Sequence, residues 1–261
     1  MTLFRHELRR GRTAFIIWTA VIGFMLAVSV FVFPEMKSQM DTIGDMFSSM
    51  GSFTAAFGME KINFGQLTGY YAVECGNVLG LGGAFFAAML AAAMLSKEER
   101  DRTAEFLLTH PVTRTRVVSE KLLAVLAQIA AMNLIIFGLA AGAIAAIGEQ
   151  VPWKLLVLLH LAYLFMQLEL AGICFGVSAF IRRGGVGIGI GIAAFMYFLN
   201  IIANITKELK FLKFITPYGY CDGGDIAVNN SLDWPKLAVG AAICAAGIAV
   251  AYCQYRRKDI K

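Results

Sequence analysis

Long apolar runs separated by short polar segments dominate the 261-residue sequence. A helix that crosses a bilayer needs about 20 consecutive apolar residues, whereas transmembrane strands are short and alternate in polarity. Six runs are long and continuous enough to be helices, at residues 14–33, 71–95, 122–147, 153–180, 184–206 and 235–254. The pattern therefore predicts an all-α membrane protein with six transmembrane helices, which form a single domain over residues 1–261.

Two amphipathic segments flank the first of these runs. Residues 1–12 combine four arginines with Leu3, Phe4 and Leu8, which is typical either of a short helix on the inner membrane surface or of a plain basic tail. Beyond Phe33-Pro34, where the first span should end, apolar residues recur at steps of three and four, at Met36, Met40, Ile43, Phe47 and Met50. This spacing predicts an amphipathic helix, which either packs on its neighbours at the interface or gates a substrate.

Small residues recur four positions apart in several spans. The second span carries Gly76, Gly80, Ala84, Ala88 and Ala92, the third carries Gly138, Gly142 and Ala146, and the fifth opens with Gly185, Gly187, Gly189 and Gly191. Such stripes allow helix backbones to approach closely inside a membrane. We therefore expect them to mark the contacts between the helices.

Composition and charge agree with a membrane protein, since 58% of the residues are hydrophobic and 16% are charged. The net charge of +5 could suggest a nucleic-acid partner. However, sixteen of the 23 Lys and Arg residues fall in the N-terminal tail, residues 96–121, Arg182-Arg183 and the C-terminal tail, which share one side when six helices alternate. Basic residues accumulate in cytoplasmic loops. We therefore expect both termini in the cytoplasm, a multi-pass location in the cytoplasmic (inner) membrane, contact with membrane lipid, and no nucleic acid.

Several polar side chains interrupt the apolar runs, and they are candidates for a substrate pathway: Asn133, Gln167, Glu169 and Asn200. Glu169 lies deepest, and an ionisable group at that depth must face protein or a wet cavity. It is either a substrate or proton site, or a protonated carboxyl that is hydrogen-bonded between helices. His160 is expected to make an interhelical hydrogen bond rather than to bind a ligand.

Catalytic and nucleotide-binding motifs are missing from the sequence. It contains no Walker A motif, zinc-protease motif or nucleophile elbow, and no metal-ligand spacing of Cys or His. We therefore expect no catalytic residue, metal or cofactor in this chain. Any energy from ATP would have to come from another protein.

The polar insert at residues 96–121 is the most charged part of the chain, with six Lys or Arg and five acids. Glu98, Glu99 and Glu105 suit the first half of a short helix, because the helix dipole favours anions there. Phe106-Leu107-Leu108 would supply an apolar anchor for a partner, and Pro111 would end the helix. A solvated loop of mixed charge is the alternative, although an exposed Phe-Leu-Leu run is unusual in one.

Residues 69–121 resemble the permeases of ABC-2-type ABC transporters. The resemblance rests on the Gly- and Ala-rich second span, Glu98-Glu99, Thr103-Ala104-Glu105-Phe106-Leu107-Leu108, Pro111-Val112-Thr113-Arg114 and Lys121. Arg102 stands where that family usually has glycine. The chain's start (Phe4 to Arg9) and its end (Arg256 to Ile260) are also similar to the family's first and last residues.

This resemblance implies a transmembrane subunit that exports or extrudes a substrate, paired with a second identical or related permease subunit. Two copies of a separate ATPase subunit would bind ATP and Mg and drive it. Residues 98–114 would form a cytoplasmic coupling helix between the second and third spans. The implied contacts with the ATPase are Glu98, Glu99, Thr103, Glu105, Phe106, Leu107, Leu108, Pro111 and Arg114.

Two other classes are compatible with a polytopic membrane protein. An ion- or proton-coupled secondary transporter would use Glu169, and inverted repeats or broken helices would be its signs. A membrane-embedded enzyme would need clustered His, Asp or Ser residues, which the sequence does not show.

Overall fold

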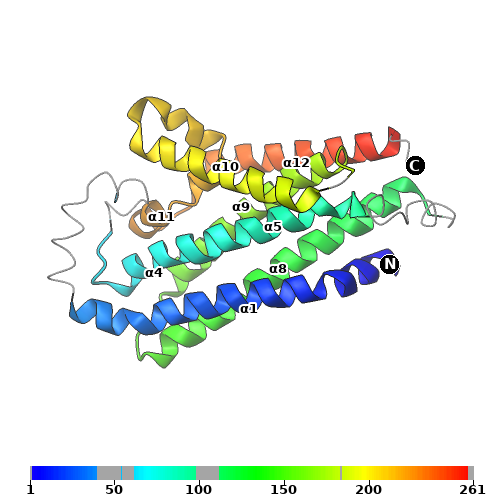
Figure 1. Ribbon diagram of the computed structural model, residues 1–261. Coiled ribbons are helices and arrows are strands. Elements are labelled where there is room, and N and C mark those ends of the chain that lie inside the picture. Colours follow the sequence, from blue (N-terminus) through cyan, green and yellow to red (C-terminus); the bar gives the residue numbers. More distant parts are fainter. Residues whose placement is uncertain (1, 40–53, 55–61, 98–111, 183, 258–261) are drawn as a thin grey trace.

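The computed structural model describes residues 2–39, 54, 62–97, 112–182 and 184–257 (Figure 1). In this part of the chain six helical stretches are long and apolar enough to cross a membrane. They are α1 (Thr2–Ser38), the second span (Leu67–Met94), α8 (Arg114–Ala146), α9 (Trp153–Ser178), α10 (Gly185–Ile205) and α12 (Trp234–Arg257). The prediction of an all-α fold with six spans is confirmed.

Helix α1 differs from its prediction at both ends. Residues 2–12 are helical but continue directly into the span, so no break separates a surface helix from the membrane helix. At the other end α1 passes Pro34 and stops at Ser38, about one turn later than predicted. The predicted amphipathic helix runs from Met36, which belongs to α1, to Met50, and its positions from Met40 onward lie outside the described residues.

The second span consists of three parts. Helix α4 (Leu67–Cys75) is followed by a single π-helical stretch, η1 (Gly76–Gly80), and then by α5 (Leu81–Met94). A π-bulge adds a residue to a turn and changes which side chains face a neighbour, and such bulges are frequent at functional sites. Here it carries Gly76 and Asn77, which line one cavity together with residues of α9 and α10.

Helix α9 lies at the centre of the bundle, with α5, α8 and α12 packed around it (Figure 1). Helix α1 pairs with α8, and α10 packs on α5. The predicted contact through small residues is present between α10 and α5. A Cβ atom added at Gly185 would lie 2.4 Å from the Ala92 carbonyl oxygen, and one at Gly189 would lie 2.4 Å from that of Ala88. By contrast, Gly138 and Gly142 of α8 have open space around them.

A second close crossing was not predicted. Gly172 and Gly176 of α9 meet Gly247 of α12, and a Cβ added at Gly176 would lie 2.6 Å from the Gly247 carbonyl oxygen. The two α9 glycines are four residues apart, which is the small-xxx-small spacing that could have revealed this contact.

The segment between α10 and α12 is folded back into the bundle. It forms η2 (Lys207–Phe214), η3 (Pro217–Tyr220) and α11 (Gly223–Asn229). Although this segment is polar in sequence, Tyr218, Tyr220, Cys221 and Ile226 are buried against the helices. We call this end of the bundle the loop end. The opposite end, where the N-terminus of α1 and the C-terminus of α12 both lie, is the terminal end (Figure 1).

Candidate functional sites

Most of the predicted coupling residues lie outside the described residues: Glu98, Glu99, Thr103, Glu105, Phe106, Leu107, Leu108 and Pro111. Arg114 is described, and it begins α8 at the terminal end. Its Nη1 donates hydrogen bonds to the carbonyl oxygens of Arg256 at 3.0 Å and Tyr255 at 3.4 Å. A cation is favourable at the C-terminal end of a helix. Arg114 therefore ties the start of α8 to the end of α12.

Three charged side chains meet in the core of the terminal end, and we call them the ion triad: Glu7, Lys97 and Lys121. Lys121 Nζ donates to Glu7 Oε1 at 3.0 Å and to the Met94 carbonyl oxygen at 2.7 Å. Lys97 Nζ donates to Glu7 Oε2 at 3.1 Å. Glu7 and Lys121 are both 0% exposed. Burial lowers the pKa of Lys97, and the charge and hydrogen bond of Glu7 oppose that shift.

The ion triad includes both ends of the polar insert, because Lys97 is the second residue of the insert and Lys121, two turns into α8, is its last residue. It joins both ends of that insert to α1. A second tie reinforces this connection, since Glu120 accepts a hydrogen bond from the Phe4 backbone N–H at 3.0 Å and pairs with Arg116 at 2.9 Å. Glu7 was not predicted as a site residue, although a lone acid in the arginine-rich first turns was a signal.

Two of the four predicted pathway residues bond directly to each other. Asn133 Nδ2 donates to Gln167 Oε1 at 2.7 Å and to the Ile129 carbonyl oxygen at 2.9 Å. Gln167 Nε2 donates to the Leu79 carbonyl oxygen of η1 at 3.4 Å. This buried bridge connects α8, α9 and the π-helical stretch.

Glu169 faces a different direction from Gln167, because residues two apart on a helix do not share a face. Its Oε2 accepts a hydrogen bond from the Tyr220 hydroxyl of η3 at 2.8 Å, and the side chain is 3% exposed. A Cβ added at Gly240 of α12 would lie 2.2 Å from the same oxygen. Glu169 therefore sits between α9, α12 and η3, apart from the Asn133–Gln167 bridge.

His160 makes the expected hydrogen bond between helices. Its Nε2 lies 2.8 Å from the Tyr71 hydroxyl of α4, and both residues are buried. The edge of the Phe137 ring of α8 also meets the imidazole, at 5.2 Å between centroids. This cluster holds α4, α8 and α9 together near the loop end.

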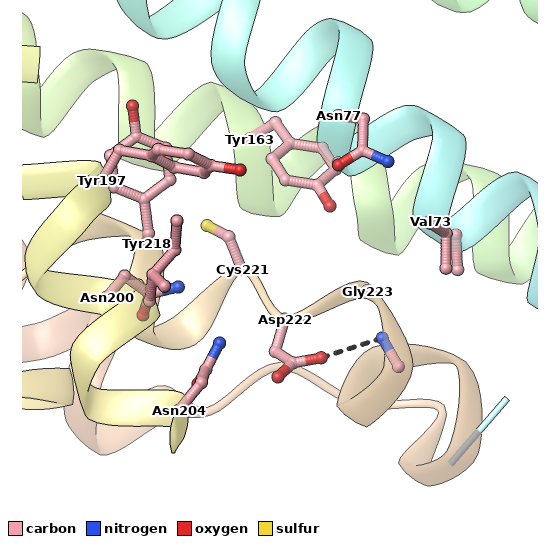
Figure 2. Close-up of a pocket in the computed structure, with 14 residues that line it drawn as sticks. Val73, Asn77, Tyr163, Tyr197, Asn200, Asn204, Tyr218, Cys221, Asp222 and Gly223 are labelled. Carbon is pink, nitrogen blue, oxygen red and sulfur yellow. Dashed lines mark hydrogen bonds between the residues drawn. The ribbon is translucent and has the colours of Figure 1, made fainter. Parts of the chain in front are cut away.

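The fourth predicted residue, Asn200, lines a small cavity of about 70 Å³ near the loop end. We call it the tyrosine cavity. Figure 2 shows Tyr163 and Asn77 on one side of it and Asn200, Asn204 and Asp222 on the other. The described residues that line it are Ala72, Val73, Gly76, Asn77, Tyr163, Tyr197, Asn200, Ile201, Asn204, Tyr218, Cys221, Asp222, Gly223 and Gly224.

Asp222 is the one charged side chain among the described residues that line the tyrosine cavity. Its Oδ1 caps α11 by accepting hydrogen bonds from the backbone N–H groups of Gly224 at 3.0 Å and Asp225 at 3.3 Å. Burial and the charge of Asp225 raise the pKa of Asp222, while Lys213 and the two backbone bonds act in the opposite direction. Asp222 was not predicted as a site residue, because the segment around it is polar in sequence and carries no catalytic motif.

The described residues thus form a multi-pass helical membrane protein with a buried ion cluster at one end and a polar cavity at the other. In the part of the chain that the structure describes, no group of His, Cys, Asp and Glu could hold a metal ion.

Comparison with known protein families identifies the family to which this membrane protein belongs. Residues 1–260 match the family described as ABC-2 family transporter protein, and the chain belongs to that family. A comparison with curated proteins gave no significant match. Members of the family are transmembrane subunits of ABC transporters, and partner ATPases hydrolyse the ATP.

Proposed function

We propose that this chain is an export permease whose ATPase subunits dock at the terminal end, on the coupling segment at residues 98–114. The observation that supports the proposal most strongly is the ion triad. It fastens both sides of the polar insert to α1 through buried contacts of 3.0 and 3.1 Å. Because Arg114 also bonds to the end of α12, a displacement of the insert would reach the first and last spans together.

The burial of the triad makes it suited to such transmission. A buried ion pair that loses one partner leaves an uncompensated charge, which is strongly unfavourable. Helices joined in this way therefore move as a unit, as rigid-body transitions between access states require. When ATP binds, the two ATPase subunits would close. This closure would push the insert and turn α1 and α8 relative to α9.

The orientation of the protein in the membrane follows from the same proposal. ATP is cytoplasmic, so the terminal end and both termini would face the cytoplasm of the inner membrane. The arginine-rich first turns of α1 agree with this orientation. A cysteine at Thr115, which is exposed at the terminal end, should resist an impermeant thiol reagent, and one at Ser231, exposed at the loop end, should react. The reverse result would invert the topology.

The docking proposal is tested by Phe106→Ala together with Leu107→Ala. Removal of an aromatic anchor from an interface often costs about 2 kcal/mol or more, so we expect the double variant to lose most of the ATPase that co-purifies with the parent. Glu105→Ala should reduce coupling between transport and ATP hydrolysis with a milder loss of assembly, because exposed charges mainly affect pairing and association rate.

The chain offers a matched control at the other end. Phe211 and Leu212 of η2 are also adjacent, and Phe211 is 57% exposed. Phe211→Ala with Leu212→Ala makes the same chemical change at the loop end, and the ATPase should remain bound. Equal co-purification of both double variants would show that the ATPase docks elsewhere.

The second permease subunit, identical or related, belongs to the same proposal. It is supported by the family, whose transporters combine transmembrane subunits with ATPases. Two ATPase copies would then dock on two coupling segments.

A further inference from the structure

The tyrosine cavity contains polar groups that have no partner in the part of the chain that the structure describes. Among the described residues, the hydroxyls of Tyr163 and Tyr218 and the Oδ1 atom of Asn200 have no hydrogen-bond partner. Tyr163 is 2% exposed and Tyr218 is 6% exposed. A buried polar group without a partner costs about 1–3 kcal/mol. A cluster of such groups around one cavity therefore indicates a ligand that supplies the missing hydrogen bonds.

A glycine in the lining leaves room for one of the tyrosines. A Cβ added at Gly76 would lie 2.8 Å from the Tyr163 hydroxyl oxygen, so any larger residue would displace that side chain. Gly76 also begins the π-helical stretch that contains Asn77, which lies near Tyr163 in Figure 2. Both features favour a binding site over a packing defect, because π-bulges are frequent at functional sites.

The chemistry of the lining selects the ligand. Hydroxyl and amide oxygens accept hydrogen bonds, and Asp222 adds a negative charge, while no Lys, Arg or His is among the described residues that line the cavity. The rings of Tyr163, Tyr197 and Tyr218 add faces that attract cations. Tyr197 and Tyr218 pack edge to face with their centroids 5.4 Å apart. Acceptors, aromatic rings and one carboxylate together suit an organic ammonium group.

The size of the cavity limits what can enter it. A water molecule needs about 10–15 Å³ of such space, so a cavity of about 70 Å³ holds a group of only a few heavy atoms. That is enough for a primary or short alkyl ammonium group, with the rest of a larger substrate outside. Asn77, which lines the cavity, is exposed, so the cavity is not sealed inside the bundle.

We propose that the tyrosine cavity binds the ammonium group of a cationic amine substrate. This inference rests on the proposed export function, and it adds the chemical class of the substrate. A second cavity of about 190 Å³ at the loop end shares Asp222 with the first and is lined by Asp225 and Asp233 as well. Its one lysine, Lys236, donates to Asp233. Acidic residues thus continue from the tyrosine cavity toward the loop end, along a path that a cation could follow outward.

The test is ligand binding to the purified chain in detergent, without any ATPase. Ethylammonium chloride is titrated while the midpoint of thermal unfolding is recorded, with NaCl, KCl and ethanol as comparisons at matched concentration. A ligand that binds only the folded state raises this midpoint. We expect ethylammonium at saturation to raise it by about 2 °C or more above the NaCl and KCl values, and ethanol to have no such effect.

Three variants locate the site. Asp222→Asn removes the charge but keeps an N-cap side chain for α11, and it should weaken ethylammonium binding about tenfold. Tyr163→Phe removes a hydroxyl that has no protein partner, and it should weaken binding about threefold or more. Tyr71→Phe is the matched control, since Tyr71 is a buried tyrosine outside the cavity lining. It should leave the affinity for ethylammonium unchanged.

Several results would overturn the proposal. Equal shifts with ethylammonium, sodium and potassium would mean that the site takes inorganic cations, and an ethanol shift of similar size would mean that charge is irrelevant. If a variant fails to fold, the comparison of these four solutes on the parent chain still tests whether the cavity binds an ammonium group. Because no ATPase is present, failure here leaves the docking proposal intact, and failure of the Phe106→Ala and Leu107→Ala test leaves ammonium binding intact.

Discussion

The ion triad and the tyrosine cavity both contain buried polar groups. Those of the triad bond to one another, whereas several of those in the cavity have no partner among the described residues. In the triad, Glu7 accepts from two lysines, and Lys121 also donates to the Met94 carbonyl oxygen. In the cavity, the hydroxyls of Tyr163 and Tyr218 find no partner among the described residues. A satisfied network makes a packed core more rigid, whereas unsatisfied groups are costly unless something else binds them.

This difference supports the two roles that we propose for the two ends of the bundle. The terminal end is built from mutual contacts between α1, α8 and the end of the second span, and it suits the transmission of force. The loop end is built around a space, and it suits the capture of a ligand. A variant that removes a bonded group at the terminal end should therefore lower the stability of the protein. A variant that removes a group without a partner at the loop end should leave the stability unchanged or raise it.

The largest effect is expected from Lys121→Met. It leaves Glu7 buried with Lys97 as its one ion-pair partner among the described residues, and loss of one member of a buried pair costs about 3–5 kcal/mol. Unfolding by denaturant in detergent should reveal this loss, whereas Lys154→Met, at an exposed position on α9, should change little. Adding Glu7→Gln to Lys121→Met should restore part of the stability. No recovery in that double variant would mean that the ion pair itself is not the important interaction.

A smaller effect should separate two buried tyrosines. Tyr71→Phe removes a hydroxyl that is bonded to His160 at 2.8 Å, and it should cost about 1 kcal/mol. Tyr163→Phe removes a hydroxyl without a partner, and the free energy of unfolding should stay the same or rise slightly in the absence of ligand. Thermal unfolding of the two variants side by side checks the order. A greater loss in Tyr163→Phe would show that its hydroxyl is satisfied within the protein.

The smallest effect is expected from Glu169→Gln. The amide oxygen of glutamine can still accept the hydrogen bond from the Tyr220 hydroxyl, so assembly should be intact and stability should change by less than about 0.5 kcal/mol. Transport measured over a range of pH is the informative assay. If the variant transports as the parent does at every pH, Glu169 is a hydrogen-bonding residue. A changed pH dependence would instead place it on the transport route.

Much of the fold could be predicted because lipid allows few structures. Every backbone polar group in the hydrocarbon must be bonded internally, so continuous apolar runs could only be helices, and all six spans were located from sequence. Helix pairing was partly visible as well, since Gly185 and Gly189 do pack on Ala88 and Ala92. The crossing of α9 and α12 also has its signature, at Gly172 and Gly176, but it was overlooked.

The sites were harder to predict because they depend on pairs that are distant in sequence. Glu7 and Lys121 are 114 positions apart, and Tyr220 and Glu169 are 51 apart. Gln167 and Glu169 were grouped as one pathway, although the helix turns them toward different neighbours. The tyrosine cavity was missed because η3 and α11 look like a polar loop until they fold against α9 and α10.

One measurement tests the division between the two ends most directly. The permease is reconstituted with its ATPase in lipid vesicles, and ATP hydrolysis is followed as ethylammonium is added. The account predicts stimulation in the parent and in Phe211→Ala with Leu212→Ala, and loss of stimulation in Phe106→Ala with Leu107→Ala. A coupling-segment variant that keeps the full stimulated rate would contradict the account, because ATP-driven motion would then enter the membrane part somewhere other than residues 98–114.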